Sequence, residues 1–378
     1  MVDPRTATDI PISDWLALER IPRVGPLSIA RLMDAFGSPR AAMEANPKEI
    51  SRRTGLSEKL ARSIADFKPP KADIDRDIDI LESLEARVVT RWDPEYPDNL
   101  KEIYDPPALL FVRGVLLEQD CNAVAVVGTR HPSRYGVQMA QTITAGLARA
   151  GVTVTSGLAR GIDTVCHRAA LDKGGRTIGV LGCGVDVAYP RENKALIGDM
   201  SRLGAVVSEF RPGIVPHPTN FYRRNRIISG LSKCVLVVEA ARNSGSLITA
   251  HHAIDQNRDV FAVPGSVMNK RSEGPHSLLK QGAGLAESAE DILQAFSQSR
   301  PAESQVPLFH PIESDEDLAP EAKAVLDALE PDPDPVPIDV LCETLAVDAG
   351  KLAGLLLELE LRGLVRQHPG KMFSRVEP

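Results

Sequence analysis

The chain has 378 residues, of which 43% are hydrophobic and 25% are charged, a composition typical of a globular protein with two or three domains. No apolar run reaches the length of a membrane span, and the first residues lack a secretory signal, so the sequence predicts a cytoplasmic protein with no membrane partner. The net charge of −7 is uneven, because 16 acidic and 6 basic residues after residue 300 leave the first 300 residues at +3. The total charge therefore does not exclude a nucleic-acid partner.

Residues 1–70 are predicted to form a helical domain. Apolar side chains recur at helical spacing in two stretches, 15–36 and 50–67. The turn around Gly25 resembles a helix-hairpin-helix, a motif that presents the backbone amides of a glycine turn to a DNA phosphate. Arg23 stands where that motif usually has its other glycine, so phosphate binding and a purely structural role both stay open.

Residues 71–297 are predicted to form an α/β domain. Short apolar runs alternate here with helix-length stretches, and the runs are 123–127, 152–155, 177–181, 205–208, 235–238 and 260–263. Val, Ile and Leu strands that alternate with helices, such as those expected at 135–150 and 247–257, indicate a doubly wound, mostly parallel sheet. The segment 86–119 is interpreted as an extended lead-in with two extra strands.

The C-terminal part is predicted to contain a linker and a winged helix. Residues 298–318 are polar, acidic and proline-containing, which indicates a linker. In the domain 319–378, helical patterns at 320–330, 337–346 and 348–362 precede a hairpin that turns at 368–371, which together describe a winged helix. The last helix carries Glu358 and Glu360, which disfavours reading of the major groove and favours a protein-contact or regulatory role.

The predicted strands end in glycine, hydroxyl and arginine residues. These ends are Gly128-Thr129-Arg130, Ser156-Gly157-Leu158-Ala159-Arg160-Gly161, Gly182-Cys183-Gly184 and Ser244-Gly245-Ser246. In a doubly wound sheet such turns gather along one edge, where helix N-termini expose amides and arginine grips phosphate oxygens. Tight packing of strand against helix is the alternative role for any one glycine turn. Four turns of matching chemistry favour an edge that binds phosphate.

No catalytic, metal or cofactor site is indicated. The sequence lacks a Gly-x-Gly-x-x-Gly after the first strand of the α/β domain and any Gly-x-x-x-x-Gly-Lys-Ser/Thr, which argues against dinucleotide binding and ATP hydrolysis. Asp163 and His167 lie four residues apart, but such a pair is more often a packing and capping device. His251 and His252 point to different helix faces, and the five scattered cysteines contain no Cys-x-x-Cys pair, which argues against a metal site or a disulfide framework.

The segment 221–232 combines arginine with aromatic residues. Phe221 and Tyr222 precede three arginines within four residues, and this pattern supplies flat faces for unstacked bases and positive charge for phosphates. The alternative is the solvated basic face of an amphipathic helix that docks through residues such as Ile227 and Leu231. Docking does not explain why the exposed side is arginine, so we favour a surface for a single strand.

Taken together, these motifs resemble the DprA/Smf family, DNA-processing protein A. The resemblance covers about residues 85–270 and rests on the strand ends, on Asp186-Val187-Ala188-Tyr189-Pro190, on Ser208-Glu209-Phe210 and on the segment 221–232. It implies an extended Rossmann-like domain that binds single-stranded DNA, forms a homodimer and helps to load the RecA recombinase in homologous recombination and natural transformation. It also implies a sterile-alpha-motif-like helical domain before this domain, a winged helix after it, and no enzymatic activity.

The resemblance also implies a nucleic-acid site. Arg130 is expected to grip a phosphate, with Arg224 and Arg226 completing a cationic pocket. Phe221 is expected to stack or wedge against a base, and Tyr222 stands where the family often has proline. The remaining predicted contacts are Gly128, Thr129, Ser156, Gly157, Arg160, Gly161, Asn225, Ser244, Gly245, Ser246 and Thr249. None of these contacts reads base edges, so we expect little sequence preference and a strong salt dependence.

Two other functions compete with this one. Lysine-decarboxylase-like nucleotide phosphoribohydrolases share a related Rossmann arrangement, but their Pro-Gly-Gly-x-Gly-Thr-x-x-Glu turn ends in a catalytic glutamate that the segment 244–250 lacks. A winged-helix transcription regulator is the second alternative, and the acidic charge of the last helix disfavours it. Release of a free base would favour the first alternative, and tight binding to one duplex sequence would favour the second.

Overall fold

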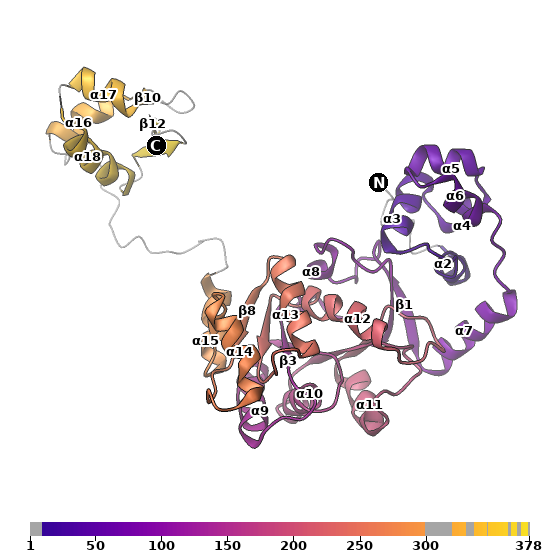
Figure 1. Ribbon diagram of the computed structural model, residues 1–378. Coiled ribbons are helices and arrows are strands. Elements are labelled where there is room, and N and C mark those ends of the chain that lie inside the picture. Colours follow the sequence, from indigo (N-terminus) through magenta and orange to yellow (C-terminus); the bar gives the residue numbers. More distant parts are fainter. Residues whose placement is uncertain are drawn as a thin grey trace. The chain divides into compact units, whose positions relative to one another are not determined.

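The structure, a computed structural model, describes residues 10–298, 320–329, 336–345, 347–361, 364–368 and 372–376. It divides into two units, Met1–Ser299 and Arg300–Pro378. In the first unit, a group of helices precedes a large sheet that is covered by further helices (Figure 1). Within the described ranges, no helix is long and apolar enough to cross a membrane.

Short helices form the N-terminal part of the first unit, as the sequence predicted for residues 1–70, and a further helix that begins at Lys71 was not predicted. They are α2 (Ile12–Glu19), α3 (Pro26–Phe36), α4 (Pro39–Glu44), α5 (Pro47–Thr54), α6 (Glu58–Ala65) and α7 (Lys71–Ser83). The side chains of Ser38, Asn46 and Ser57 cap α4, α5 and α6. Arg23, between α2 and α3, adopts a φ of 69°, which costs a residue other than glycine about 1–2 kcal/mol. The turn therefore keeps a glycine-like conformation although arginine stands there.

The helical part shares a hydrophobic core with the edge of the sheet. The ring of Trp15 in α2 stacks on that of Trp92, with centroids 5.3 Å apart. Ala108 and Leu109 are buried in the same cluster as Leu32 of α3. Full burial of a side chain such as leucine contributes about 1.5–3 kcal/mol, so the helices are packed onto the sheet.

The sheet has nine strands in the order β1-β2-β6-β5-β4-β3-β7-β8-β9 among the described residues. Their bounds are β1 (Ala86–Thr90), β2 (Leu109–Gly114), β3 (Ala123–Val127), β4 (Thr153–Ser156), β5 (Thr177–Leu181), β6 (Ala205–Ser208), β7 (Cys234–Val237), β8 (Asp259–Ala262) and β9 (Gly284–Leu285). β1 and β2 pair antiparallel with each other, and β2 pairs antiparallel with β6. The remaining pairs are parallel. The predicted parallel core and the two extra strands are confirmed, and the two-residue β9 was not predicted.

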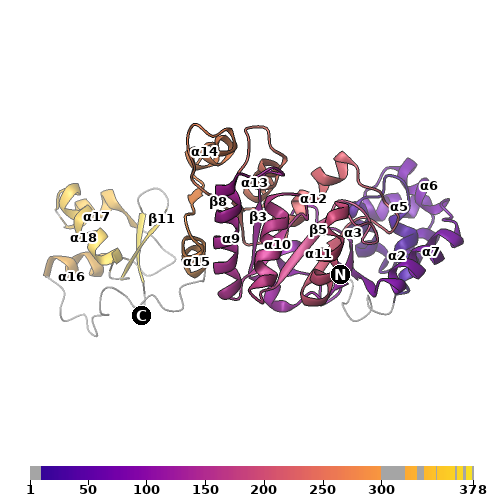
Figure 2. The same ribbon diagram turned by 90° about the horizontal axis from the view of Figure 1, so that it is seen from below.

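Helices cover both faces of this sheet. Their bounds are α8 (Asp98–Lys101), η1 (Glu118–Cys121), α9 (Arg134–Arg149), α10 (Ile162–Asp172), η2 (Arg191–Asn193), α11 (Lys194–Leu203), α12 (Pro218–Gly230), α13 (Gly245–Asp255), η3 (Lys270–Ser272), α14 (Glu273–Lys280) and α15 (Ala289–Gln298). Figures 1 and 2 show α9, α10 and α11 on one face and α12 and α13 on the other. Along β3, Val124 and Val126 pack toward α9 and α10, whereas Ala125 and Val127 pack toward α12 and α13. An apolar residue at every position therefore buries the strand on both faces.

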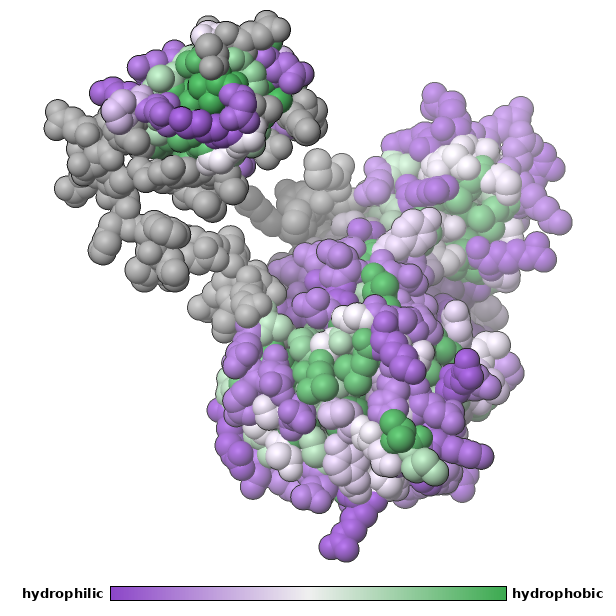
Figure 3. All heavy atoms as spheres, turned by 60° about the vertical axis from the view of Figure 1, so that its left-hand side comes forward, coloured by the Kyte–Doolittle hydropathy of each residue, from purple (hydrophilic) through white to green (hydrophobic). Residues whose placement is uncertain are grey.

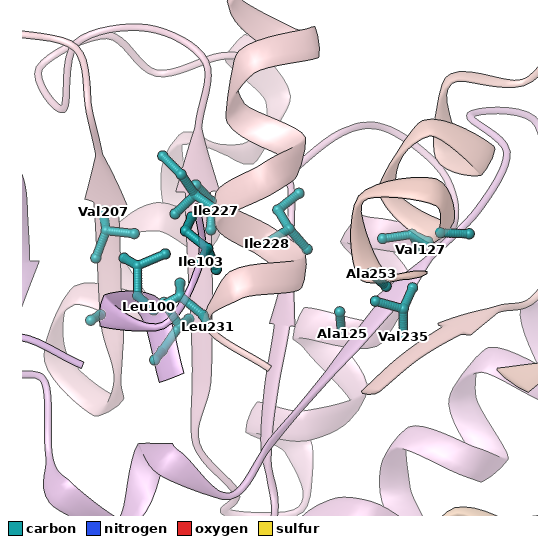
Figure 4. Packing of buried hydrophobic residues seen from close by; sticks show 14 of the residues in the cluster. Leu100, Ile103, Ala125, Val127, Val207, Ile227, Ile228, Leu231, Val235 and Ala253 are labelled. Carbon is teal, nitrogen blue, oxygen red and sulfur yellow. The ribbon is translucent and has the colours of Figure 1, made fainter. Parts of the chain in front are cut away.

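The helix α12 carries the arginine-rich segment. Ile227 and Leu231 at its C-terminal end are buried beside Leu100 and Ile103, and Ile228 is buried on the side of Val127 and Ala253 (Figure 4). Each of the three contributes about 1.5–3 kcal/mol of burial free energy. The expected docking is thus confirmed, but Arg224 and Arg226 are only 5% and 6% exposed. The alternative of a solvated basic face is wrong for these two residues.

The second unit has the helices and strands of a winged helix. Its elements are α16 (Pro320–Asp327), β10 (Val336–Pro337), α17 (Ile338–Leu345), α18 (Ala349–Leu361), β11 (Val365–His368) and β12 (Met372–Arg375), with strand order β10-β12-β11. Leu326, Leu341, Leu352 and Phe373 are buried in its core. The predicted turn at 368–371 and linker at 298–318 lie almost entirely outside the described residues.

Candidate nucleic-acid interface

A hollow of about 720 Å³ lies where β3 and β7 end and where the turns to α9 and α13 meet the start of α12. We call this hollow the strand-end pocket. Most of the predicted contacts line it, namely Gly128, Thr129, Arg130, Phe221, Arg224, Asn225, Ser244, Gly245, Ser246 and Thr249. The strand ends and the arginine-rich segment, far apart in sequence, therefore meet at one place.

Arg224 is a buried cation in the wall of this pocket. Its Nη1 donates to the carbonyl of Gly157 and, at 2.6 Å, to that of Val180, and its Nε donates to Asn225 Oδ1 at 3.2 Å. Burial lowers the pKa of Arg224 to about 10, and the nearby carboxylate of Asp163 opposes this change. The guanidinium therefore stays protonated at neutral pH and supplies a fixed positive charge.

Phe221 lies close to two arginines. The guanidinium carbons of Arg130 and Arg224 are each 5.8 Å from the centroid of its ring. Tyr189 stacks on this ring with a centroid distance of 5.3 Å and an interplanar angle of 29°. A Cβ on Gly182 would lie 2.7 Å from Phe221 Cδ1, so the glycine makes room for the ring. The result is an aromatic surface flanked by positive charge, which suits a base and its phosphates.

Arg130 differs from Arg224 because it is exposed. Its side chain has no hydrogen bond or ion pair within the part of the chain that the structure describes. A free guanidinium can donate two parallel hydrogen bonds to phosphate oxygens. Arg130 is therefore the cation in the pocket that can grip a phosphate directly.

The turn before α13 supplies hydroxyl groups to the pocket. The Oγ atoms of Ser244 and Ser246 are 2.8 Å apart, and the Ser246 amide donates to Ser244 Oγ at 3.4 Å. Asn225 Nδ2 donates to the carbonyl of Gly245 at 3.3 Å and so ties α12 to this turn. The positive end of the α13 dipole also lies here.

Two turns at this edge are already occupied by acidic groups of the chain itself. Asp163 Oδ2 accepts hydrogen bonds from the amides of Gly157 and Ala159 at 3.1 and 3.3 Å, and burial raises the pKa of this carboxyl. Glu239, which is 2% exposed, accepts from the amide and the hydroxyl of Ser133 at the start of α9. The amides of Ser133, Gly157 and Ala159 are therefore bonded to carboxylates of the chain itself, and the expected use of the Gly157 amide for a phosphate is wrong.

Arg226 lies outside the pocket, although it is only two residues beyond Arg224. Its guanidinium pairs with Glu209 and, at 3.3 Å, with Asp105. The side chains of Arg226 and Glu209 are 8% and 7% exposed. Because two residues turn a helix by about 200°, Arg226 faces away from Arg224. The expectation that Arg226 completes the cationic pocket is therefore wrong.

The glycines of the strand ends allow close packing. A Cβ on Gly128 would lie 2.6 Å from a side-chain atom of Ile162, and one on Gly157 would collide with the Arg224 guanidinium. Gly161 has a φ of 79°, and a Cβ there would collide with the turn that holds Arg130. The packing role thus applies to all three, and only Gly128 among them also lines the pocket.

Ser156 and Arg160 also lie outside the pocket lining and have partners of their own. Ser156 is fully buried, and its Oγ donates to the carbonyl of Val126 at 2.6 Å. Arg160 is exposed and pairs with Glu192. Surface ion pairs of this kind are weak, so Arg160 remains able to exchange Glu192 for a phosphate, whereas Ser156 has a structural role.

Tyr189 was not predicted as a site residue. It lies in the loop after β5 and lines the pocket together with His131, Pro216 and Pro218. The sequence signal that could have found it is an aromatic residue a few positions after the glycine turn at the end of β5. Such a turn lies on the same edge as the other strand ends.

Two buried titratable groups lie close to Arg224 but outside the pocket lining. Burial lowers the pKa of His167 to about 3 and raises that of the Cys183 thiol to about 12. Near pH 7 these groups are a neutral imidazole and a protonated thiol, so together they do not form an activated base–nucleophile pair. In the described segments, no cluster of three or more His, Cys, Asp and Glu residues is arranged to hold a metal ion.

Three family models match successive parts of the chain. The model described as "DNA recombination-mediator protein A" matches residues 87–297. The "DprA-like N-terminal HHH domain" matches residues 12–65, and the "DprA winged helix domain" matches residues 310–371. The chain belongs to the DprA/Smf family. The predicted family and the predicted three-part fold are thereby confirmed.

Individual members of the DprA/Smf family are similar over most of the chain. Protein Smf of Escherichia coli is 41% identical over 327 residues, which cover 85% of each chain. The DNA processing protein DprA of Streptococcus pneumoniae is 46% identical over 201 residues, or 53% of this chain and 71% of that protein.

Two solved DprA structures also match. The crystal structure of Streptococcus pneumoniae DprA superposes with a TM-score of 0.67 at 35% identity, covering 75% of this chain and 98% of that one. DprA from Helicobacter pylori, whose structure is described as giving insight into its single-stranded DNA binding mode, has a TM-score of 0.51 at 27% identity. That match covers 57% of this chain and 97% of the Helicobacter pylori chain.

Proposed function

We propose that this chain binds single-stranded DNA in the strand-end pocket and acts as a recombination mediator without enzymatic activity. The observation that carries the proposal is the ring of Phe221, stacked on Tyr189 and placed 5.8 Å from the guanidinium carbons of both Arg130 and Arg224. The description of the Helicobacter pylori relative as a single-stranded DNA binder supports the same ligand.

In this proposal the two arginines have different parts. Arg130 is exposed and has no hydrogen-bond or ion-pair partner in the described residues, so it donates directly to a phosphate. The guanidinium of Arg224 is held by two carbonyls, so it attracts a phosphate through its charge alone. This attraction is stronger than it would be in water, because the guanidinium is buried. Phe221 offers its surface to a base, and every base has a face that can stack on it.

The proposed binding depends on contacts to the DNA phosphates and on stacking of bases, so it depends little on the base sequence. Each phosphate contact to a single strand contributes about 0.7 to the slope of log affinity against log salt concentration. A fluorescence anisotropy titration at several salt concentrations measures this slope. Oligonucleotides of different composition are expected to bind with similar affinity, and a duplex is expected to bind more weakly because its bases are stacked.

The test of the pocket is the variant Arg130→Ala. We expect weaker single-strand binding and a slope reduced by about 0.7, with unchanged thermal unfolding. Arg149→Ala is the matched control, because Arg149 is also exposed but ends α9 at the far end from the pocket. Equal binding by the wild type and the Arg130→Ala variant would contradict the proposal.

We further propose that the chain loads the RecA recombinase onto the bound strand, in recombination and in natural transformation. The support is membership of a family described as recombination mediators. The test is RecA filament formation on a single strand covered by single-strand-binding protein, with and without this chain. Release of free base from nucleotides in a control reaction would instead favour the phosphoribohydrolase alternative.

A homodimer through the α/β domain is also proposed. Ile254 and Leu285 are 53% and 49% exposed at the edge of the sheet where β9 lies. Beside them is a hollow of about 490 Å³ lined in part by Phe261 and Leu278. Figure 3, which brings the β8 side of Figure 1 forward, shows hydrophobic residues ringed by hydrophilic ones. Ile254→Lys is expected to yield a monomer in sedimentation analysis, and an unchanged mass would contradict this interface.

A further inference from the structure

A group of exposed cations lies beyond the strand-end pocket. Arg134 begins α9, Arg242 lies in the turn after β7, and Lys270 and Arg271 belong to η3. All four side chains are exposed. Among the residues that the structure describes, none of the four has an acidic partner. We call these four residues the outer cationic surface.

This surface is joined to the pocket by hydrogen bonds. The Nε of Arg271 donates at 2.8 Å to the carbonyl of His131, which is one of the residues that line the pocket. The carbonyl of Arg271 accepts from the Ala240 amide at 2.7 Å, and the Tyr135 hydroxyl donates to the carbonyl of Pro264 at 2.7 Å. The turns after β3, β7 and β8 are therefore held together as one continuous edge.

Apolar side chains stand out from the same edge. Val267 and Met268, which precede η3, are 82% and 89% exposed. Single exposed hydrophobic residues are common on protein surfaces, but these two are adjacent and lie within three residues of Lys270. Tyr135, at 43% exposure, adds an aromatic ring nearby. Apolar faces beside unpaired cations match the alternation of bases and phosphates in a single strand.

The acidic groups in this region leave the surface positive. Glu239 is buried and engaged with Ser133. Glu273 follows η3 directly and is exposed. Burial raises the pKa of the Tyr135 hydroxyl, and the nearby carboxylates of Glu287 and Glu239 add to this change. The four exposed cations therefore outnumber the exposed carboxylates of Glu273 and Glu287.

We propose that a single strand leaving the pocket past His131 continues over the outer cationic surface. Its phosphates then contact Arg242, Lys270 and Arg271, and a base rests on Met268. This inference depends on the proposed function of the pocket and adds a second binding segment to it. A short oligonucleotide fills the pocket alone, whereas a longer one also reaches the outer cationic surface.

The test compares two oligothymidylates, of about 4 and about 16 nucleotides, a range typical of single-strand site sizes. In the double variant Arg242→Ala/Lys270→Ala, affinity for the long strand is expected to fall about tenfold at about 0.15 M salt, with a slope smaller by about 1.4. Affinity for the short strand is expected to stay within about twofold. The variant Met268→Ser is expected to weaken long-strand binding about fivefold without changing the salt slope.

Matched controls separate the possible outcomes. The double variant Arg149→Ala/Arg168→Ala removes the same charge from exposed residues that do not belong to the outer cationic surface, and it is expected to bind both strands as the wild type does. Equal losses in the two double variants, or equal losses for both strand lengths, would overturn the inference while leaving the pocket in place. Failure of the wild type to bind either strand would overturn the proposed function itself.

Discussion

Arg224 and Arg226 stand two residues apart in one charge run, yet they belong to different regions of the molecule. Arg224 faces the strand-end pocket, where neutral carbonyls accept its hydrogen bonds and the carboxyl of Asp163 is nearby. Arg226 faces the other side of α12 and is neutralised by Glu209 and Asp105. The difference teaches that a basic run in a sequence predicts positive charge but does not say whether a ligand or the protein itself will use it.

The largest expected effect is a loss of stability caused by substitution of Arg226, on the side of α12 that faces away from the pocket. Removing one member of a buried ion pair leaves the other charge unpaired, so Arg226→Ala is expected to lower the free energy of unfolding by about 3–5 kcal/mol. The variant Arg226→Met/Glu209→Leu removes both charges and is expected to regain most of that stability. Urea unfolding measures both values. A loss below about 1 kcal/mol in the single variant would show that solvent already screens the pair.

Gly157→Ala tests the position of Arg224, the arginine on the pocket side of α12. The new methyl group collides with the Arg224 guanidinium, and such overpacking costs about 1–3 kcal/mol. The displaced charge is expected to weaken single-strand binding as well. Gly198→Ala in α11 is the matched control, because a Cβ there meets nothing within 4 Å. That substitution is expected to stabilise the fold by about 0.5–1 kcal/mol and to leave binding unchanged.

Phe221→Ala separates stacking from charge within the pocket. Loss of a stacking surface is expected to cost about 1–3 kcal/mol of binding free energy per base. The salt slope is expected to stay at its wild-type value, because no phosphate contact is lost. A slope that fell as it does for Arg130→Ala would mean that the ring serves mainly to position the arginines.

Tyr222→Ala is expected to have the smallest effect. Tyr222 also lines the pocket, but it is 56% exposed, and its ring meets that of His252 edge-on at 5.6 Å, whereas Phe221 stacks on Tyr189. Surface substitutions usually change stability by less than about 0.5 kcal/mol. Anisotropy titration and thermal unfolding are both expected to match the wild type, and a loss comparable with that of Phe221→Ala would reveal a second stacking position.

Much of the fold could be predicted from the sequence because its strands are buried on both faces. In β3 and β5 nearly every residue is apolar, and such short runs between helices are typical of the central strands of a parallel sheet. The strands β9 and β10 have two residues each, too few to show any periodicity. Their existence depends on the neighbouring strand that offers hydrogen bonds.

The candidate site was predicted less completely for a different reason. Gly128, Arg130 and Phe221 lie at strand ends or helix starts, and topology alone brings these together. The burial of Arg226 depends on Glu209 and Asp105, which are distant in sequence. No local pattern reveals such a partner, so the sequence could not separate the arginine that faces the pocket from the one that stabilises the fold.

The stacking of Trp15 on Trp92 has a consequence for how the chain can be divided. Because Ala108 and Leu109 are covered by the same helices, a fragment that begins after residue 70 carries a freshly uncovered apolar face on the sheet. Such a fragment is expected to precipitate or to associate with another apolar surface unless polar residues replace Trp92 and Leu109. The N-terminal helices can be deleted from the sequence, but the remaining domain then loses part of its hydrophobic core.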